Sequence, residues 1–80
     1  MQYYYVYILE DKNESHHYTG ITKNMKCRLM AHNSGKNIST SANRPWRVKT
    51  AIAFTDRQRA LEFEKYLKSP SGRAFALKRL

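Results

Sequence analysis

The stretch Tyr3–Leu9, which reads YYYVYIL, decides the fold of this chain of 80 residues. It is the longest apolar run in the sequence, and it is dense in aromatic and β-branched residues, which is typical of a β-strand. It falls far short of the ~20 apolar residues that a membrane-spanning helix needs. Because side chains alternate along a strand, Tyr4, Val6 and Ile8 share one face. The other face carries Tyr3, Tyr5, Tyr7 and Leu9.

The residues that follow predict a hairpin. Asp11, Lys12, Asn13 and Glu14 form a turn, and His16–Ile21 is a second strand, antiparallel to the first. Gly20 either ends this strand or lets another part of the backbone approach closely.

The middle of the chain predicts one helix and one loop. Thr22 is a suitable N-cap for a helix over residues 23–34, and Gly35 is a natural stop for it. The segment Lys36–Arg44 is rich in Ser, Asn and Thr, and we expect a polar loop there.

The last third of the chain predicts a strand and two helices. Thr55 and Gln58 form a capping-box pattern before a helix. The expected elements are a strand at Trp46–Phe54, a helix at Asp56–Lys68, a break at Ser69–Gly72 and a short helix at Arg73–Leu80. The predicted order is β-β-α-β-α-α. It is typical of an α+β fold in which a small antiparallel three-stranded sheet is flanked by helices, and we expect residues 1–80 to form one domain.

The charge of the chain points to a polyanionic partner. The net charge is +9, and no acidic residue occurs between Ser15 and Thr55. Such an asymmetric basic surface predicts binding to nucleic acid, with DNA as the expected partner and RNA not excluded. The alternative is that the lysines merely keep a small protein soluble. No helix combines a broad apolar face with a lysine-rich one, so a membrane surface is not the expected partner. The candidate phosphate contacts are Lys23, Lys26, Lys36, Arg44, Lys68 and Arg73.

Cysteine usage bounds the remaining chemistry. Cys27 is the single cysteine, which excludes an internal disulfide and a cysteine-based zinc site. The first strand follows Met1 and Gln2 directly, leaving no room for a signal peptide. We therefore expect a cytoplasmic protein.

Glu64 is the residue most indicative of chemistry. The helix expected at Asp56–Lys68 places Ala60, Phe63 and Leu67 on its buried face, and Glu64 falls in the same stripe, within ~40° of Ala60. An ionised carboxylate that faces inward is costly unless a cation pairs with it or coordinates to it. A divalent metal ion, Mg²⁺ or Mn²⁺, is one such cation, and an ion pair with Arg28 is the structural alternative.

Four further residues can join Glu64. Tyr7 and Tyr18 lie on the two strands of the hairpin, and Arg28 and His32 are neighbours at i and i+4 on one helix face. The set suits phosphodiester cleavage: a carboxylate holds a metal ion, an arginine contacts the phosphate, and a tyrosine or His32 accepts a proton from water. Each residue alone has a structural alternative, because a strand tyrosine is most often a packing residue and a histidine in an apolar stripe is most often a hydrogen-bonded core residue.

In this ordered set the chain resembles the GIY-YIG nuclease family, in particular its small stand-alone bacterial members. The first motif appears as Tyr5-Val6-Tyr7 and the second as Tyr18-Thr19-Gly20. The intervals of eleven residues from Tyr7 to Tyr18 and of ten from Tyr18 to Arg28 are similar to the family spacing, as are His32 and the segment around Glu64. The resemblance runs from about Tyr3 to Arg79.

The resemblance implies a nuclease fold, a divalent metal ion on Glu64 and hydrolysis of a DNA strand. It places Tyr7 or Tyr18 near the attacking water and Arg28 on the phosphate. The sequence departs from the family pattern at Tyr5, where the family has glycine, and at Thr19, where it has isoleucine. Many members also carry an asparagine after the metal-binding glutamate, whereas no asparagine follows Asn43 here, and Arg73 could take over its contact.

Three functions follow as hypotheses. The first is a metal-dependent DNA endonuclease that uses Tyr7, Tyr18, Arg28, His32 and Glu64. The second is a non-catalytic nucleic-acid-binding module with a nuclease-like fold, suggested by the missing asparagine. The third is an accessory subunit that docks onto a larger protein partner. A domain of this size has little surface left to recognise a base sequence once it has bound the nucleic-acid backbone.

Overall fold

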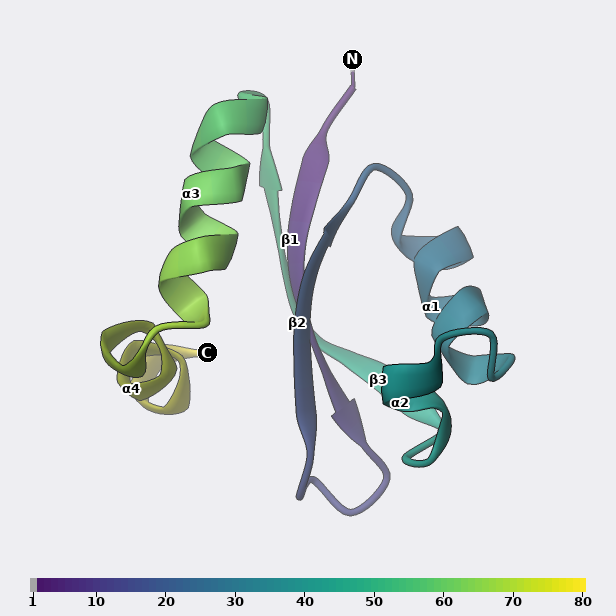
Figure 1. The fold of residues 1–80 in the computed structure, drawn as a ribbon. Coiled ribbons are helices and arrows are strands. Elements are labelled where there is room, and N and C mark those ends of the chain that lie inside the picture. Colours follow the sequence, from purple (N-terminus) through teal and green to yellow (C-terminus); the bar gives the residue numbers. More distant parts are fainter. Residues whose placement is uncertain (1) are drawn as a thin grey trace.

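The computed structural model describes residues 2–80 and shows the predicted α+β architecture (Figure 1). The predicted order of elements is confirmed, with one additional short helix, α2. The elements are β1 (Tyr4–Asp11), β2 (His17–Thr22), α1 (Met25–Asn33), α2 (Ile38–Ser41), β3 (Trp46–Phe54), α3 (Arg57–Leu67) and α4 (Pro70–Arg79). Among residues 2–80, no helix is both long and apolar enough to cross a membrane.

The sheet is built around β1. Its strand order is β2-β1-β3, and both neighbours run antiparallel to β1. Seen edge-on, the sheet separates two layers of helices, with α3 and α4 on one face and α1 and α2 on the other (Figure 1). The first strand is therefore central and covered on both faces, while β2 and β3 are the edges.

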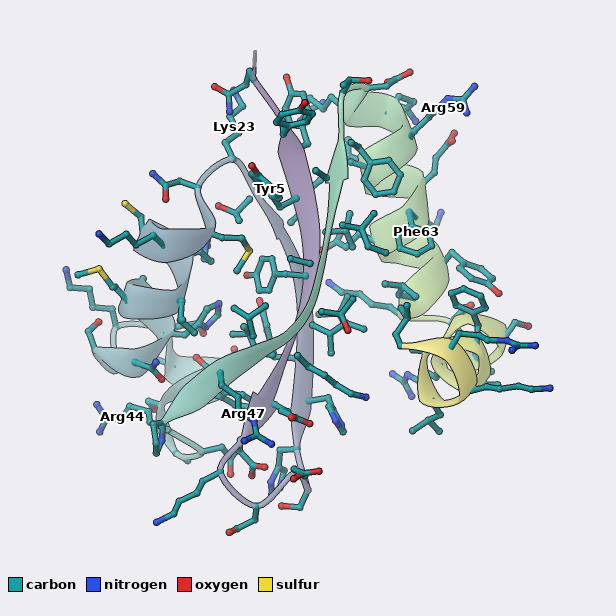
Figure 2. The ribbon with its side chains drawn as sticks, turned by 180° about the vertical axis from the view of Figure 1, so that it is seen from behind. Tyr5, Lys23, Arg44, Arg47, Arg59 and Phe63 are labelled. Carbon is teal, nitrogen blue, oxygen red and sulfur yellow. The ribbon has the colours of Figure 1, made fainter. Side chains whose placement is uncertain are left out.

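Each face of β1 supplies one core. Val6 and Ile8 pack with Ala60 and Leu67 of α3, as their alternation in the sequence predicts. Partly buried aromatic residues extend this core, among them Phe63 of α3 (Figure 2). Its ring centroid is 5.5 Å from that of Phe54.

The opposite face of β1 carries the second core. Tyr7, Leu9 and Trp46 are its buried members, and Met25 and Leu29 of α1 pack against it. Figure 1 shows α1 and α2 on this side of the sheet. Tyr7 is thus a buried residue that faces α1, whereas α3, which carries Glu64, covers the other face.

Several predicted boundaries are wrong. The first strand continues to Asp11, which therefore lies in the strand and not in the turn. Asn24, and not Thr22, caps α1 by accepting from the Cys27 amide. Asp56, and not Thr55, caps α3 by accepting from the Gln58 and Arg59 amides.

Two segments predicted to lack regular structure are partly helical. The expected loop at Lys36–Arg44 contains α2, which Asn37 caps by accepting from the Ser39 amide. The expected break at Ser69–Gly72 is only a corner, because Ser69 caps α4 and Pro70 already occupies its first turn. Proline at this position lacks only an amide hydrogen that the helix would leave unbonded, so it starts the helix rather than breaking it.

Gly72 allows α4 to turn back against the end of α3. A Cβ atom placed on Gly72 would lie 1.8 Å from the Tyr66 carbonyl oxygen and 2.6 Å from the Leu67 Cα. Both are backbone atoms, so neither can move aside without shifting a helix. The close approach of the two helices therefore requires glycine here.

We expect Gly72→Ala to destabilise the protein by about 1–3 kcal/mol, the usual range for overpacking. Alanine gains about 1 kcal/mol in helix propensity, but the backbone clash outweighs that gain. The free energy of unfolding in urea measures the change. Ser71→Ala, at an exposed position of the same helix turn, should stay within about 0.5 kcal/mol of wild type. A Gly72→Ala protein as stable as wild type would contradict the required close approach.

Candidate active site at the edge of the sheet

Tyr7 lies at the centre of the candidate site. It is 1% exposed and pairs in register with Gly20 of β2. A Cβ atom on Gly20 would lie 2.5 Å from the Tyr7 hydroxyl oxygen and 2.7 Å from its Cζ. Glycine in the second motif therefore leaves the space into which the Tyr7 hydroxyl extends. Both roles predicted for Gly20 are wrong in detail, because β2 continues to Thr22 and the group that comes close is the Tyr7 side chain rather than a backbone.

A chain of buried hydrogen bonds leads from Tyr7 to α2. The Tyr7 hydroxyl lies 3.1 Å from His32 Nε2, and His32 Nδ1 lies 2.9 Å from Thr40 Oγ1. The Thr40 hydroxyl donates its only hydrogen to the Asn37 carbonyl. With its hydrogen used there, the hydroxyl accepts from His32 Nδ1–H, and this tautomer leaves Nε2 to accept from the Tyr7 hydroxyl; we take this arrangement as our prediction. All three side chains are about 1% exposed.

Hydrogen bonds between side chains and backbone around Trp46 hold the Tyr7–His32–Thr40 series of hydrogen bonds in place. The Trp46 Nε1 donates to the Thr40 carbonyl at 2.7 Å. Asn33, which follows His32, donates from Nδ2 to the Trp46 carbonyl at 3.0 Å and accepts from the Trp46 amide. The start of β3 thus ties α1 and α2 together behind His32.

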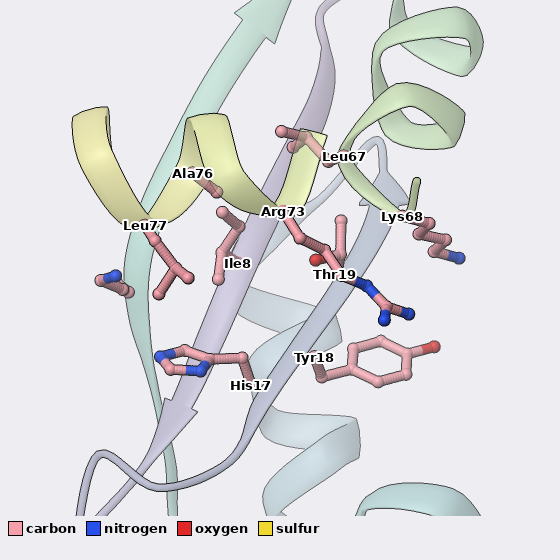
Figure 3. Close-up of a pocket in the computed structure, with 10 residues that line it drawn as sticks. Ile8, His17, Tyr18, Thr19, Leu67, Lys68, Arg73, Ala76 and Leu77 are labelled. Atoms are coloured by element: carbon pink, nitrogen blue, oxygen red, sulfur yellow. The ribbon is translucent and has the colours of Figure 1, made fainter. Parts of the chain in front are cut away.

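Tyr18 lies where the two faces of the sheet meet. Its ring centroid is 4.8 Å from that of His32 and 6.3 Å from that of Tyr7, so it belongs to the core beneath α1. It also lines a pocket with Lys68 and Arg73 from the opposite layer, and Figure 3 shows the Arg73 guanidinium beside the Tyr18 ring. An edge strand makes this possible, because a half-buried side chain there reaches both sides.

The pKa of the Tyr7 hydroxyl depends on burial and on charged residues from both helical layers. Burial raises the pKa of the Tyr7 hydroxyl to about 12; Tyr18 and Glu64 contribute in the same direction, and Arg28 opposes them. The charges of Arg28 on α1 and Glu64 on α3 both act on this hydroxyl, although the two helices cover opposite faces. Of the five predicted residues, Tyr7, Tyr18 and His32 lie together, Arg28 and Glu64 act on the Tyr7 hydroxyl through their charges, and Tyr7 itself stays protonated at neutral pH.

His32 is held neutral. Burial lowers its pKa, and the positive charge of Arg28 lowers it further. A neutral imidazole can accept a proton at Nε2, the nitrogen that faces Tyr7. Arg28 is exposed on the same helix and, with Lys36 and His32, lines a shallow pocket of about 450 Å³ between α1 and α2.

Glu64 is partly buried, and its partner is not the one considered in the sequence. Its side chain is 18% exposed, and Oε2 lies 3.0 Å from Lys68 Nζ, one helical turn further on. Arg28 makes no ion pair with it among residues 2–80, so the predicted alternative of a Glu64–Arg28 pair is wrong. No group of three His, Cys, Asp or Glu side chains that could hold a metal ion occurs in this part of the chain.

That donor set fits one kind of metal ion. Zinc sites use several His, Cys or carboxylate ligands from the protein, which the described residues do not supply. Mg²⁺ keeps several of its waters and is commonly held by one or two carboxylates together with phosphate oxygens. A single, partly buried carboxylate such as that of Glu64 is compatible with a Mg²⁺ site of this kind.

The predicted phosphate contacts surround the site. Lys26 lies on α1 and Lys36 follows it, while Lys23 and Arg44 bracket the α1–α2 layer (Figure 2). Lys68 and Arg73 lie on the opposite layer, beside Tyr18. Within residues 2–80, only three of the fifteen Lys and Arg side chains make ion pairs, so most of the positive charge is available to an anion.

Thr40 is the site residue that sequence reasoning missed. Its buried hydroxyl lies 2.9 Å from His32 Nδ1, yet the sequence places it in an apparently irregular polar segment. The signal available was Asn37, a strong helix N-cap residue three positions earlier. Nothing in the sequence connects that cap to the buried imidazole.

Comparisons with known proteins support a single family. The model of the GIY-YIG catalytic domain matches residues 3–78. A UPF0213 protein of Streptococcus pneumoniae is 38% identical over 65 residues, which are 80% of this chain and 65% of that protein. The chain therefore spans just under two thirds of the length of that relative. UPF0213 protein BH0048 of Halalkalibacterium halodurans is 38% identical over 71 residues, 88% of this chain and 74% of that protein.

A solved structure is also similar. The solution NMR structure of the UPF0213 protein BH0048 from Bacillus halodurans superposes with a TM-score of 0.56 at 33% sequence identity. The match covers 95% of this chain and 83% of the other.

The neutral buried His32 predicts a pH-dependent stability. Its pKa in the folded protein is lowered from the ordinary ~6.5, so below that pH the unfolded chain binds a proton that the folded protein does not. The free energy of unfolding should therefore fall as the pH drops below ~6.5, by up to about 1.4 kcal/mol per pH unit. Urea unfolding at several pH values between 7 and 5 measures this slope.

A control variant and an NMR measurement accompany these unfolding experiments. The pKa of Asp11 is also shifted; although its burial opposes the change, hydrogen bonds from His16 and Ser15 lower it to about 2, which acts below this pH window. His17→Gln, at an exposed histidine, should keep the slope. Nitrogen-15 NMR of the imidazole should show the hydrogen on His32 Nδ1, and a hydrogen on Nε2 at neutral pH would contradict the proposed hydrogen-bond chain.

Proposed function

The chain belongs to the GIY-YIG catalytic domain family, and on that premise we propose that it is a nuclease that hydrolyses phosphodiester bonds in DNA with the help of one divalent metal ion. The observation that supports this best is the cluster of Tyr7, Tyr18 and His32, with the charges of Arg28 and Glu64 both acting on the Tyr7 hydroxyl. Four elements, namely the strands β1 and β2 and one helix from each layer, supply these groups, which a purely structural role for each residue would not require.

Arg28 is the proposed phosphate ligand. Its guanidinium is exposed on α1, and it lines the shallow pocket together with Lys36. A guanidinium can donate two parallel hydrogen bonds to phosphate oxygens, which positions the phosphodiester and offsets the negative charge that develops during hydrolysis.

Tyr18 is the proposed acceptor of the proton from the attacking water; it would act as the phenolate, whose negative charge Arg28 or a divalent ion would have to stabilise. It is half-buried and borders the pocket lined by Lys68 and Arg73, whereas Tyr7 is buried, has a pKa of about 12 and lies 3.1 Å from His32 Nε2. The Tyr7–His32 pair packs against Tyr18 and fixes its orientation. The pair thus acts as a positioning device, and Tyr18 is the group that reaches the substrate.

Glu64 is the proposed ligand of Mg²⁺ or Mn²⁺. When bound, such an ion supplies a positive charge that stabilises the leaving oxygen of the phosphodiester. Lys68 now offsets the carboxylate charge, but its own side chain is 52% exposed and can swing away. The neighbouring Lys68 and Arg73 would remain close enough to contact the DNA backbone.

One observation favours the second function, a nucleic-acid-binding module without activity. The Lys68 ammonium already occupies one oxygen of Glu64, and no asparagine follows that residue to support a metal ion. In that case the basic surface would bind nucleic acid and Glu64 would be structural. Binding would then weaken steeply with rising salt, because contacts to phosphates release counterions.

The two functions differ in the effect of Glu64→Gln. For the nuclease, we expect this change to abolish cleavage of labelled DNA in Mg²⁺ or Mn²⁺ while binding in the absence of metal is kept. Glu62→Gln, at an exposed position of the same helix, should cleave like wild type. Equal cleavage by wild type and Glu64→Gln would rule out the nuclease mechanism and point to a contaminant. Salt-sensitive binding without cleavage by either protein would support the binding module.

The tyrosines should separate by role. We expect Tyr18→Phe to reduce the cleavage rate by about 100-fold or more, the range for loss of an acid–base group. Tyr7→Phe should reduce it less, but should destabilise the protein by about 1–3 kcal/mol because His32 Nε2 loses its buried partner. Tyr66→Phe, at an exposed tyrosine, is the matched control. The opposite order of the two rate losses in folded proteins would assign the proton transfer to Tyr7.

A further inference from the structure

A pocket of about 490 Å³ lies between the sheet and α4, on the face opposite to α1 (Figure 3). Its floor is formed by Ile8 and Thr19, which are paired neighbours on β1 and β2. Leu67, Ala76 and Leu77 form an apolar wall from α3 and α4. Sites of this size, with an apolar lining and a few polar groups, are typical of small-molecule and nucleotide binding.

The rim of this pocket is cationic. Lys49, Lys68 and Arg73 all line it, and none of its ten lining residues is acidic. Lys49 occupies the irregular step in the pairing of β1 with β3, where Ile8 pairs with Thr50 and Leu9 with Val48. An apolar interior with a cationic rim complements a ligand that carries both a flat ring and a negative charge.

The pocket is continuous with the candidate active site. Tyr18 belongs to both, since its ring packs against His32 on one side and borders the pocket on the other. Lys68 also belongs to both, because it contacts Glu64 and lines the pocket. A nucleic-acid strand whose phosphate lies at Tyr18 therefore has its adjoining nucleotide at the mouth of this pocket.

We propose that this pocket binds one unpaired nucleotide of the DNA, next to the phosphate that is cut, so that the preferred substrate is single-stranded or locally unpaired. This proposal rests on the proposed nuclease function for the position of the cut phosphate. The base enters between the floor at Ile8 and the wall at Leu77, and Arg73 and Lys68 contact its phosphate. Aromatic rings such as that of Tyr18 are common stacking partners for unpaired bases.

The preference for unpaired DNA follows from the cost of freeing a base. A base inside a duplex must first leave its stack and its partner, which costs a few kcal/mol, whereas an unpaired base does not have to. Each 1.4 kcal/mol corresponds to a factor of ten in affinity. We therefore expect single-stranded DNA to be preferred over a continuous duplex of the same sequence by about 10- to 100-fold.

Binding can be tested without any cleavage. Hexathymidylate, a single strand that cannot pair with itself, is titrated into nitrogen-15-labelled wild-type protein without metal, and amide shifts are followed by NMR. We expect the largest shifts at Thr19, Ala76 and Leu77, and much smaller shifts there with a short duplex. Shifts confined to α1 and α2, or equal shifts at the pocket with both ligands, would overturn the proposal.

Leu77→Glu tests the pocket directly. This side chain is 79% exposed, so the change should leave the fold intact, which amide dispersion in the NMR spectrum verifies. It adds a negative charge to the cationic pocket and should weaken hexathymidylate binding by tenfold or more. Met30→Glu is the matched control, because it makes the same charge change at a 63% exposed apolar residue of α1, outside the pocket. Equal weakening by the two variants would show that the effect comes from net charge alone, and would refute nucleotide binding in the pocket.

Cleavage assays separate failure of the pocket from failure of the nuclease. If wild-type protein cuts single-stranded and duplex DNA equally well and hexathymidylate leaves the pocket unshifted, the pocket proposal is wrong and the nuclease stands. If hexathymidylate shifts the pocket as expected but no DNA is cut in Mg²⁺ or Mn²⁺, the nuclease fails and the pocket stands as a single-strand binding site.

Discussion

Burial of β1 on both faces is the constraint on which the rest of the molecule depends. Val6 and Ile8 anchor α3 on one side, and Tyr7 and Leu9 anchor the α1 layer on the other. Because successive side chains of a strand alternate, a single strand orients both layers. A slip of one residue in its pairing with β2 would remove Tyr7 from the space beside Gly20 and exchange the two cores. The register of β1 therefore fixes both the stability of the fold and the position of the candidate site.

The sequence predicted the elements better than their ends. The alternation at Tyr3–Leu9 and the stripe of Ala60, Phe63 and Leu67 are strong signals, because burial of a face enforces its period. Helix starts were harder to predict. Thr55 and Asp56 are adjacent and both are good N-cap residues, so local chemistry does not choose between them. Which of the two residues caps α3 depends on where β3 ends, and that is set by the tertiary structure. The short helix α2 is missed for a related reason, since four residues are too few to show a period.

The sequence proposes the members of the candidate site, but it does not show how they are arranged. Tyr7, Tyr18, Arg28, His32 and Glu64 all follow from the sequence as a set. The sequence does not reveal that α1 and α3 cover opposite faces, because the side taken by each helix depends on how the chain crosses the sheet. Tyr7 can extend its hydroxyl toward His32 beside Tyr18 because Gly20 carries no side chain. Thr40 and the pocket beneath α4 escape prediction, since their residues come from elements far apart in the chain.

The ion pair between Glu64 and Lys68 limits how the candidate metal site can work. Pairs at i and i+4 on a helix surface contribute only about 0.3–0.5 kcal/mol, and this one is half open to solvent on the lysine side. So weak a contact holds the carboxylate in place without preventing a stronger cation from binding there. Under the proposed function, a divalent ion on Glu64 would release the Lys68 ammonium to the nearby pocket and its DNA phosphate. Metal binding and DNA binding would then strengthen each other, because a single lysine offsets the carboxylate in one state and the phosphate in the other.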